Sequence, residues 1–127
     1  MMLNIDIFAQ SGYKFDRDRV RKAMEKTLVL HGLIDNNLEI SLNVVGERKM
    51  RELHKHYMET DEVTDVLSFP LEEAVYPDGV LRLGDIVICY PVAVGQAMAE
   101  NKMVDEEMEF LAEHGLLHLL GIHHESP

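Results

Sequence analysis

Polar and apolar residues alternate in two stretches of the first half of the chain. Residues 3–7 (LNIDI) and 38–45 (LEISLNVV) place apolar side chains at every second position. A period of two is typical of a strand that buries one face. Two shorter apolar segments, residues 65–69 (DVLSF) and 84–89 (GDIVIC), also have the composition of strands. The sequence therefore predicts four strands.

Apolar residues recur at intervals of three and four in four other segments, as they do on the buried side of a helix. Asp16 is a suitable N-cap for the first of these helices, and Pro91 suits the first position of the third. Gly32 and Gly121 stand where the first and last helices would end. The predicted helices cover residues 17–30, 47–57, 91–101 and 105–120.

The predicted elements follow one another as strand, helix, strand, helix, strand, strand, helix, helix. No repeat, low-complexity segment or linker interrupts them, so residues 1–127 are expected to form one domain. The simplest packing is an α+β fold in which about four helices cover a mixed sheet of four strands.

The charge of the chain limits its partners. The formal net charge is −11, which argues against a protein that binds nucleic acid over its whole surface. Basic residues nevertheless gather in residues 14–26 and 48–55, so the sequence allows a local basic face. The simpler interpretation is that both groups lie on solvated helix faces.

Three further features bear on the compartment. No apolar run is long enough to cross a bilayer, and the N-terminus lacks the basic start of a secretory signal. Cys89 is the single cysteine, so no internal disulfide can form. These features favour a cytoplasmic protein without a membrane partner.

Histidines gather near the end of the sequence, in the segment HGLLHLLGIHH (residues 114–124). His114 and His118 are four residues apart on a predicted helix, so their imidazoles share one helix face. Gly121 ends that helix, and the chain can then turn back to bring His124 to the same ion. Three neutral imidazoles suit a tetrahedral Zn²⁺ with one open position, although nickel, cobalt or copper would also fit. The sequence therefore predicts a metal site on the last helix and the following turn.

The remaining histidines carry less information. His123 could replace His124 as a ligand, support a ligand, or lie on the surface. His31, His54 and His56 lie on or near other predicted helices, and we expect all three on the surface.

The residue after the first histidine of this segment is Gly115, where zinc proteases with the same ligand spacing carry a glutamate. That glutamate is the general base that takes a proton from the attacking water. A bound metal ion acidifies its water, so the glutamate can be dispensed with if another group manages proton transfer. The spacing keeps a metalloprotease open as one interpretation, and Gly115 argues against it.

Three segments together resemble a known family. HGLLHLLGIHH resembles the signature of the YbeY-type rRNA maturation factors and endoribonucleases. TDVLSFP (residues 64–70) is similar to that family's central strand. LGDIVIC (residues 83–89), followed by Gln96 and Ala97, is similar to its next strand and helix. The order and spacing of these segments agree over nearly the whole chain.

This resemblance implies a bacterial, cytoplasmic, single-strand-specific metallo-endoribonuclease. The implied role is maturation of the 3′ end of 16S rRNA together with ribosome quality control. The implied partners are single-stranded RNA and the small ribosomal subunit with its associated proteins. The resemblance also implies one Zn²⁺ held by His114, His118 and His124, with His114 as the catalytic candidate, in a cleft between the sheet and the last helix.

The chain departs from the family pattern at a position that bears on substrate binding. Met58 stands where the family usually has an arginine after a tyrosine, and a thioether cannot neutralise a phosphoryl oxygen. Arg48, Arg51 and Lys55 are candidates to replace that arginine, and Ser68 is a further candidate for substrate contact.

Two more departures concern the end of the sequence. His123 replaces the aspartate that precedes the last histidine in the family, and an imidazole supplies no negative charge. Family members usually continue with a further acidic helix, so we expect that C-terminal helix to be missing here. These departures favour a second hypothesis, a ribosome-associated zinc-binding factor with little catalytic activity.

Overall fold

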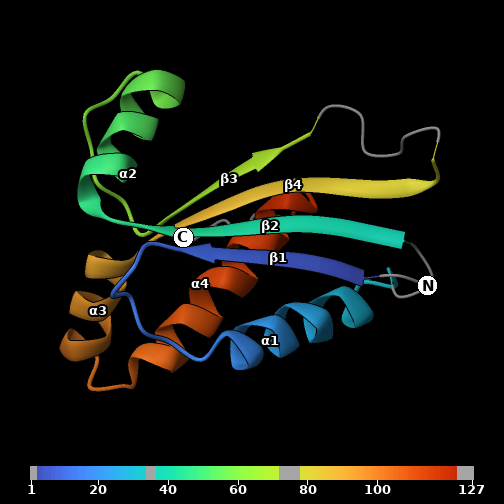
Figure 1. Ribbon diagram of the computed structural model, residues 1–127, viewed down its shortest axis with the longest axis horizontal. Coiled ribbons are helices and arrows are strands. Elements are labelled where there is room, and N and C mark those ends of the chain that lie inside the picture. The colour runs from blue at the N-terminus through green and yellow to red at the C-terminus, as the bar shows by residue number, and fades with distance from the viewer. Residues whose placement is uncertain (1–2, 34–36, 72–77, 123–127) are drawn as a thin grey trace.

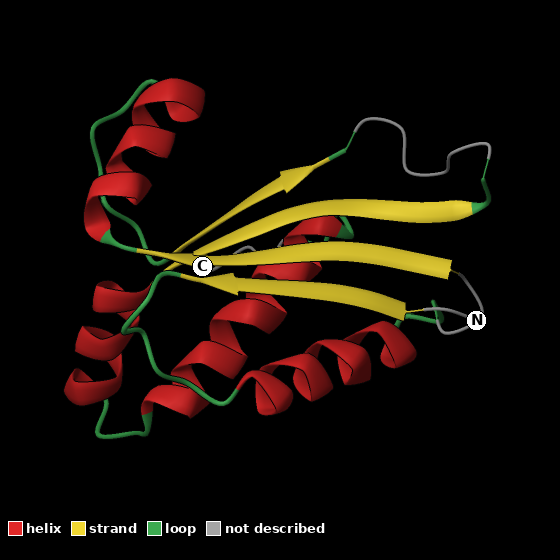
Figure 2. Ribbon diagram, viewed as in Figure 1, coloured by secondary structure: helices red, strands yellow, loops and turns green. Residues whose placement is uncertain are grey.

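The computed structural model describes residues 3–33, 37–71 and 78–122, and it confirms an α+β fold (Figure 1, Figure 2). Four strands form one mixed sheet in the order β1-β2-β4-β3, in which β3 is antiparallel to β4 and the other pairs are parallel. No helix in these ranges is both long enough and apolar enough to cross a bilayer. The elements are β1 (Leu3–Ala9), α1 (Arg17–Leu30), β2 (Asn37–Val45), α2 (Glu47–Leu53), the π-helical turn η1 (His54–Met58), β3 (Val66–Pro70), β4 (Val80–Cys89), α3 (Tyr90–Ala99) and α4 (Val104–Leu119).

The order of the elements is as predicted, and two predicted boundaries are wrong. β4 begins at Val80, well before the predicted start at Gly84, because the strand continues through a register shift opposite Glu39 and Ile40. Gly84 has a positive φ of 133°, which a bulge can use and which other residues rarely adopt. The second predicted helix is α-helical only as far as Leu53, and η1 continues it as a π-helical turn.

One face of the sheet is covered by α1 and α4, and we call it the closed face (Figure 1). The period-two pattern of the first two strands is the cause, because Ile5 and Ile7 of β1 and every second residue of β2 are buried here. Removal of these apolar side chains from water is the main force that holds the helices on the sheet. The core includes Ile5, Ile7, Leu38, Ile40, Leu42, Val44, Ile86 and Ile88 from the strands and Val20, Met24, Leu28, Met108, Leu111 and Leu116 from the helices.

The other face of the sheet, which we call the open face, has α2 and η1 above one end only (Figure 1). Beneath α2 lies a small apolar cluster of Met50, Val87 and Cys89. Away from α2 the open face is polar, and Ser41 and Asp85 hydrogen-bond to each other across β2 and β4. The uncovered part of the sheet is therefore a surface on which polar groups remain available for contacts.

Candidate metal centre and the cavities beside it

Two of the three proposed metal ligands lie side by side on α4. The ring centroids of His114 and His118 are 4.5 Å apart. Phe110, one turn earlier, stacks on His114 with a centroid distance of 6.1 Å. The predicted juxtaposition of the two imidazoles is therefore present, and nitrogen donors of this kind suit a divalent transition metal.

The third proposed ligand, His124, and its neighbour His123 lie outside the described residues. Within the described ranges, no three His, Cys, Asp or Glu side chains come close enough to hold a metal ion together. The donor set seen there thus fits a metal only if a further ligand joins His114 and His118. The three-histidine site stays a prediction.

The end of α4 has the geometry that a returning chain needs. Gly121 has a φ of +79°, a left-handed conformation that favours glycine. The N–H of Ile122 donates to the carbonyl of Leu117 at 2.9 Å, and the N–H of Gly121 donates to the carbonyl of His118 at 3.0 Å. These two bonds end the helix, so the stop predicted at Gly121 is confirmed.

Both histidine rings line a cleft of about 750 Å³, which we call the histidine cleft. Its walls are α4, the edge strand β3 with Thr64 and Asp65 before it, and η1. Tyr57 and Met58 enter the cleft from η1. The cleft thus runs around the edge of the sheet, from η1 above the open face to α4, which packs on the closed face.

Gly115 has no room for a side chain. A Cβ atom at this position would lie 2.6 Å from Cγ2 of Ile86 and 3.2 Å from both Oγ of Ser68 and Cγ2 of Val66. The glycine therefore lets α4 pack closely against β3 and β4. A glutamate here would point into the sheet and not toward the cleft, so this fold cannot place the base that a metalloprotease uses at this position.

His54 corrects our expectation that it lies on the surface. Its side chain is only 4% exposed, and its two ring nitrogens lie 3.2 Å from Oγ1 of Thr60 and 2.7 Å from Oγ1 of Thr64. The ring thereby ties η1 to the loop that leads into β3, because one imidazole can bond two hydroxyls at once. His31 and His56 are exposed, as expected.

Two polar residues that line the cleft are already engaged. Oγ of Ser68 donates to the carbonyl of Gly115 at 2.8 Å, which fixes β3 to α4. The carboxylate of Asp65 accepts from the N–H of Val66 at 2.7 Å and from Nε2 of Gln96 at 3.2 Å. Both residues therefore hold the cleft walls together, and substrate contact by Ser68 stays a prediction.

The candidate cations are exposed, and two of them form ion pairs. Arg48 pairs with Glu52 at 3.7 Å and Arg51 pairs with Asp61 at 3.4 Å, both among exposed side chains. Lys55 is exposed on η1. None of the three basic residues is among the described residues that line the cleft, whereas Met58 is. Met58, which carries a thioether, thus lines the same cleft as His114 and His118.

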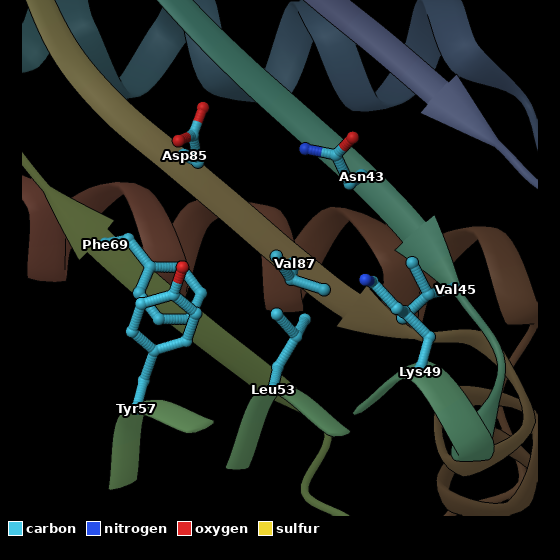
Figure 3. A pocket seen from close by; sticks show the side chains of 8 residues that line it. All are labelled: Asn43, Val45, Lys49, Leu53, Tyr57, Phe69, Asp85 and Val87. Carbon is cyan, nitrogen blue, oxygen red and sulfur yellow. The ribbon is translucent and has the colours of Figure 1, made fainter. Parts of the chain in front are cut away.

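A second cavity of about 310 Å³ lies between the open face and α2 (Figure 3), and we call it the sheet cavity. Lys49 and Leu53 line it from α2, and Tyr57 lines it from η1. These three residues are spaced by four, which places them on one side of the helical segment. The sheet supplies Asn43, Val45, Phe69, Asp85 and Val87.

The sheet cavity was not predicted from the sequence, although the spacing of Lys49, Leu53 and Tyr57 was a usable signal. Asp85 lies inside β4 and lines the cavity. Cys89 lies deeper, beneath α2, where burial raises the pKa of its thiol. The thiol is therefore protonated at neutral pH and is not a nucleophile of this site.

Comparisons with known proteins agree with the geometry. The family model described as Endoribonuclease YbeY matches residues 6–127. An Endoribonuclease YbeY from Finegoldia magna is 40% identical over 118 residues, which cover 91% of this chain and 76% of the relative. One from Thermobifida fusca is 36% identical, with coverage of 98% and 83%. The solution structure of a Thermotoga maritima protein matches 95% of this chain and 75% of its own, at 25% identity and a TM-score of 0.60. The chain belongs to the Endoribonuclease YbeY family.

Proposed function

We propose that this chain is a single-strand-specific, zinc-dependent endoribonuclease that acts in the maturation of the 3′ end of 16S rRNA and in ribosome quality control. A cytoplasmic location and contact with the small ribosomal subunit and its proteins belong to the same proposal. The observation that carries it is the pair of imidazoles, 4.5 Å apart, on the wall of a cleft of about 750 Å³. Family membership supplies the reaction class.

In this proposal His114, His118 and His124 hold one zinc ion. When bound, the ion supplies a Lewis acid for the phosphodiester and lowers the pKa of a water. The chain's own residues orient the site. Phe110 stacks on the ring of His114, and the tie between Ser68 and Gly115 holds β3 against the ligand helix. Aromatic side chains in the cleft suit single strands, because the bases of a single strand are free to stack on them.

The first experiment measures metal and cleavage together. Bound metal is determined in the purified chain, and the zinc-loaded chain is incubated with single-stranded RNA and with a duplex of the same sequence. We expect cleavage of the single strand only. The variant His114→Ala should lose both tightly bound metal and cleavage, because it removes a ligand. The control His31→Ala removes an exposed histidine from the end of α1 and should keep both.

A direct comparison defines the outcome against the proposal. The relative from Finegoldia magna is assayed beside this chain under the same conditions. If the relative cuts the single strand and the zinc-loaded chain leaves it intact, the hypothesis that this chain is a catalyst is abandoned. Cleavage that survives both His114→Ala and removal of metal would contradict the proposed role of zinc.

Met58 favours a second candidate function, a ribosome-associated zinc-binding factor with little catalytic activity. This side chain lines the histidine cleft at the position of the family arginine, and no described cation lines the cleft with it. The variant Met58→Arg separates the two candidates. If the site is catalytic but weakened, the arginine should raise cleavage on the order of 10²-fold, which is what one electrostatic donor supplies elsewhere. If cleavage stays absent while the chain binds small subunits independently of His114, the binding factor is favoured.

The metalloprotease is the weakest candidate, because the packing around Gly115 excludes the usual base. We expect the zinc-loaded chain to leave casein undigested. Digestion that His114→Ala abolishes would reverse this ranking.

A further inference from the structure

The histidine cleft and the sheet cavity share a wall. Tyr57 and Phe69 line both of them, and their ring centroids lie 5.0 Å apart. Figure 3 shows the two rings together at one end of the sheet cavity, with Lys49 at the other end. An RNA strand that extends from His114 and His118 past Tyr57 therefore reaches the sheet cavity.

The ring of Tyr57 is supported and also exposed. Phe69 contacts it at an interplanar angle of 57°, and His56 packs edge-on against it with a centroid distance of 4.5 Å. The residue is nevertheless 58% exposed. An aromatic ring that is held by neighbours and still open to solvent is a stacking platform for a base. The π-helical geometry of η1 presents it, and such turns are frequent at functional sites.

The sheet cavity offers charge and hydrogen bonds as well as a ring. The ammonium group of Lys49 forms no ion pair with any described residue, whereas the guanidinium groups of Arg48 and Arg51 each form one. Such a cation is available to a phosphate. Asn43 and Asp85 line the polar side of the cavity. A carboxylate and an amide oxygen accept hydrogen bonds from the exocyclic amino group of a base.

From these contacts we propose that the sheet cavity is a nucleobase subsite of the enzyme. The base of a nucleotide next to the scissile phosphate stacks on Tyr57 and enters the cavity, where Asn43 and Asp85 accept hydrogen bonds from its amino group. Lys49 contacts the adjoining phosphate. The cavity volume lies at the lower end of the range for small-ligand sites, which suits one base and not a longer segment. The subsite therefore favours adenine, cytosine or guanine over uracil at that nucleotide.

This inference rests on the proposed function, because it assumes that RNA occupies the histidine cleft. Its test nevertheless reads binding and not cleavage. End-labelled single-stranded RNA oligonucleotides carry one abasic nucleotide, which is moved along the sequence, and their affinity for the full chain is measured by fluorescence anisotropy. We expect one position at which loss of the base weakens binding about tenfold, since stacking of one base on a ring contributes a factor of that order.

The variant Tyr57→Ala should weaken binding of the intact oligonucleotide by the same factor of about ten. The same variant should cause no further loss of affinity for the oligonucleotide that is abasic at the sensitive position. In that oligonucleotide the stacking contact is already absent, so removal of the ring removes nothing more. Tyr57→Phe keeps the ring and should bind like the unchanged chain. Met98→Ala removes an exposed apolar side chain that is not among the described residues lining either cavity, and it should have no effect.

A second arm tests the hydrogen bonds. Uracil at the sensitive position should bind more weakly than cytosine, and Asn43→Ala combined with Asp85→Ala should reduce that difference. Circular dichroism and urea unfolding check that each variant is folded. Equal losses at all abasic positions would overturn the subsite, as would equal losses by Tyr57→Ala for intact and abasic RNA or the absence of RNA binding altogether.

The outcomes separate the subsite from the proposed function. Binding that depends on Tyr57 without any cleavage would remove the catalytic proposal and keep the base subsite. Cleavage that depends on His114, with affinity independent of Tyr57, would keep the endoribonuclease and remove the subsite.

Discussion

Leu42 and Asn43 are neighbours on β2 and belong to opposite faces of the sheet. Leu42 is wholly buried among α1, α4 and the adjoining strands. Asn43 is half-buried, donates to Oγ of Ser41 at 3.2 Å, and lines the sheet cavity. The same strand thus supplies an apolar core on the closed face and a polar, partly hollow surface on the open face.

The two faces of the sheet therefore differ in what they contribute: the closed face stabilises the fold, and the open face has room for a ligand. The closed face carries the main apolar core, and the burial of that core supplies most of the favourable free energy of folding. The open face buries a small cluster under α2 and leaves room for ligands beside it. α4 joins the two functions, because one side of the helix packs into the core while His114 and His118 line the cleft.

The largest expected effect is loss of a core side chain from the closed face. Leu42→Ala should lower the free energy of unfolding by about 2–5 kcal/mol, because it removes buried methyl groups and leaves a cavity. Its neighbour Asn43→Ala should cost about 1 kcal/mol or less, the value of one partly exposed hydrogen bond. Urea unfolding followed by circular dichroism measures both. Equal losses would mean that the open face contributes to stability as much as the core does.

The next effect concerns the contact between α4 and the sheet. Gly115→Ala should destabilise the fold by about 2 kcal/mol, because the new methyl group meets Cγ2 of Ile86 and Oγ of Ser68 in a packed interface. Gly95→Ala is the matched control on α3, where a Cβ meets nothing within 4 Å. That change should stabilise by about 0.5–1 kcal/mol through helix propensity. The two urea midpoints should therefore move in opposite directions, and a shift of both to higher urea would contradict the close packing.

These two glycines show what the sequence could predict. Helix and strand periods identify the elements, because each element must bury one side. The spacing of His114 and His118 likewise predicts their shared helix face, which the ring contact confirms. Whether a helical glycine is required by a neighbour or merely tolerated depends on tertiary packing, and no local pattern distinguishes Gly115 from Gly95.

His54 and the sheet cavity illustrate the same limit. The burial of His54 depends on hydroxyls six and ten residues later, which reach it only after the loop before β3 has folded back. The sheet cavity depends on how far α2 stands from the open face, and a spacing pattern carries no such distance. Local periodicity thus identifies faces, whereas the site depends on the separations between elements.

A smaller effect is expected where the loop before β3 is tied to η1. Thr64→Val keeps the size of the side chain and removes the hydroxyl 2.7 Å from Nε2 of His54. It should destabilise by about 1 kcal/mol, because one buried ring nitrogen loses its partner. Thr64 and His54 both line the histidine cleft, so oligonucleotide affinity should fall with the loss of order in its wall. Thr64→Ser restores the hydroxyl and should recover most of both losses; failure to recover either would show that the methyl group, and not the bond, matters.

The smallest effect belongs to an ion pair beside the open face. Nη2 of Arg82 lies 2.9 Å from Oδ2 of Asp78, and the hydrogen bond from Arg82 lowers the pKa of the Asp78 carboxyl. A lowered folded-state pKa means that the pair stabilises the fold above the unfolded pKa of about 4 and that this contribution is lost as pH falls through the folded value. Asp78→Asn should therefore lower Tm slightly at neutral pH, with a difference that shrinks in high salt because both groups face solvent. The Tm values of the two proteins should converge as the pH falls below the folded-state pKa of Asp78, since both proteins then lack the carboxylate. A Tm difference that increased on acidification would contradict this pH dependence. It would show that interactions other than the exposed charges stabilise the open face.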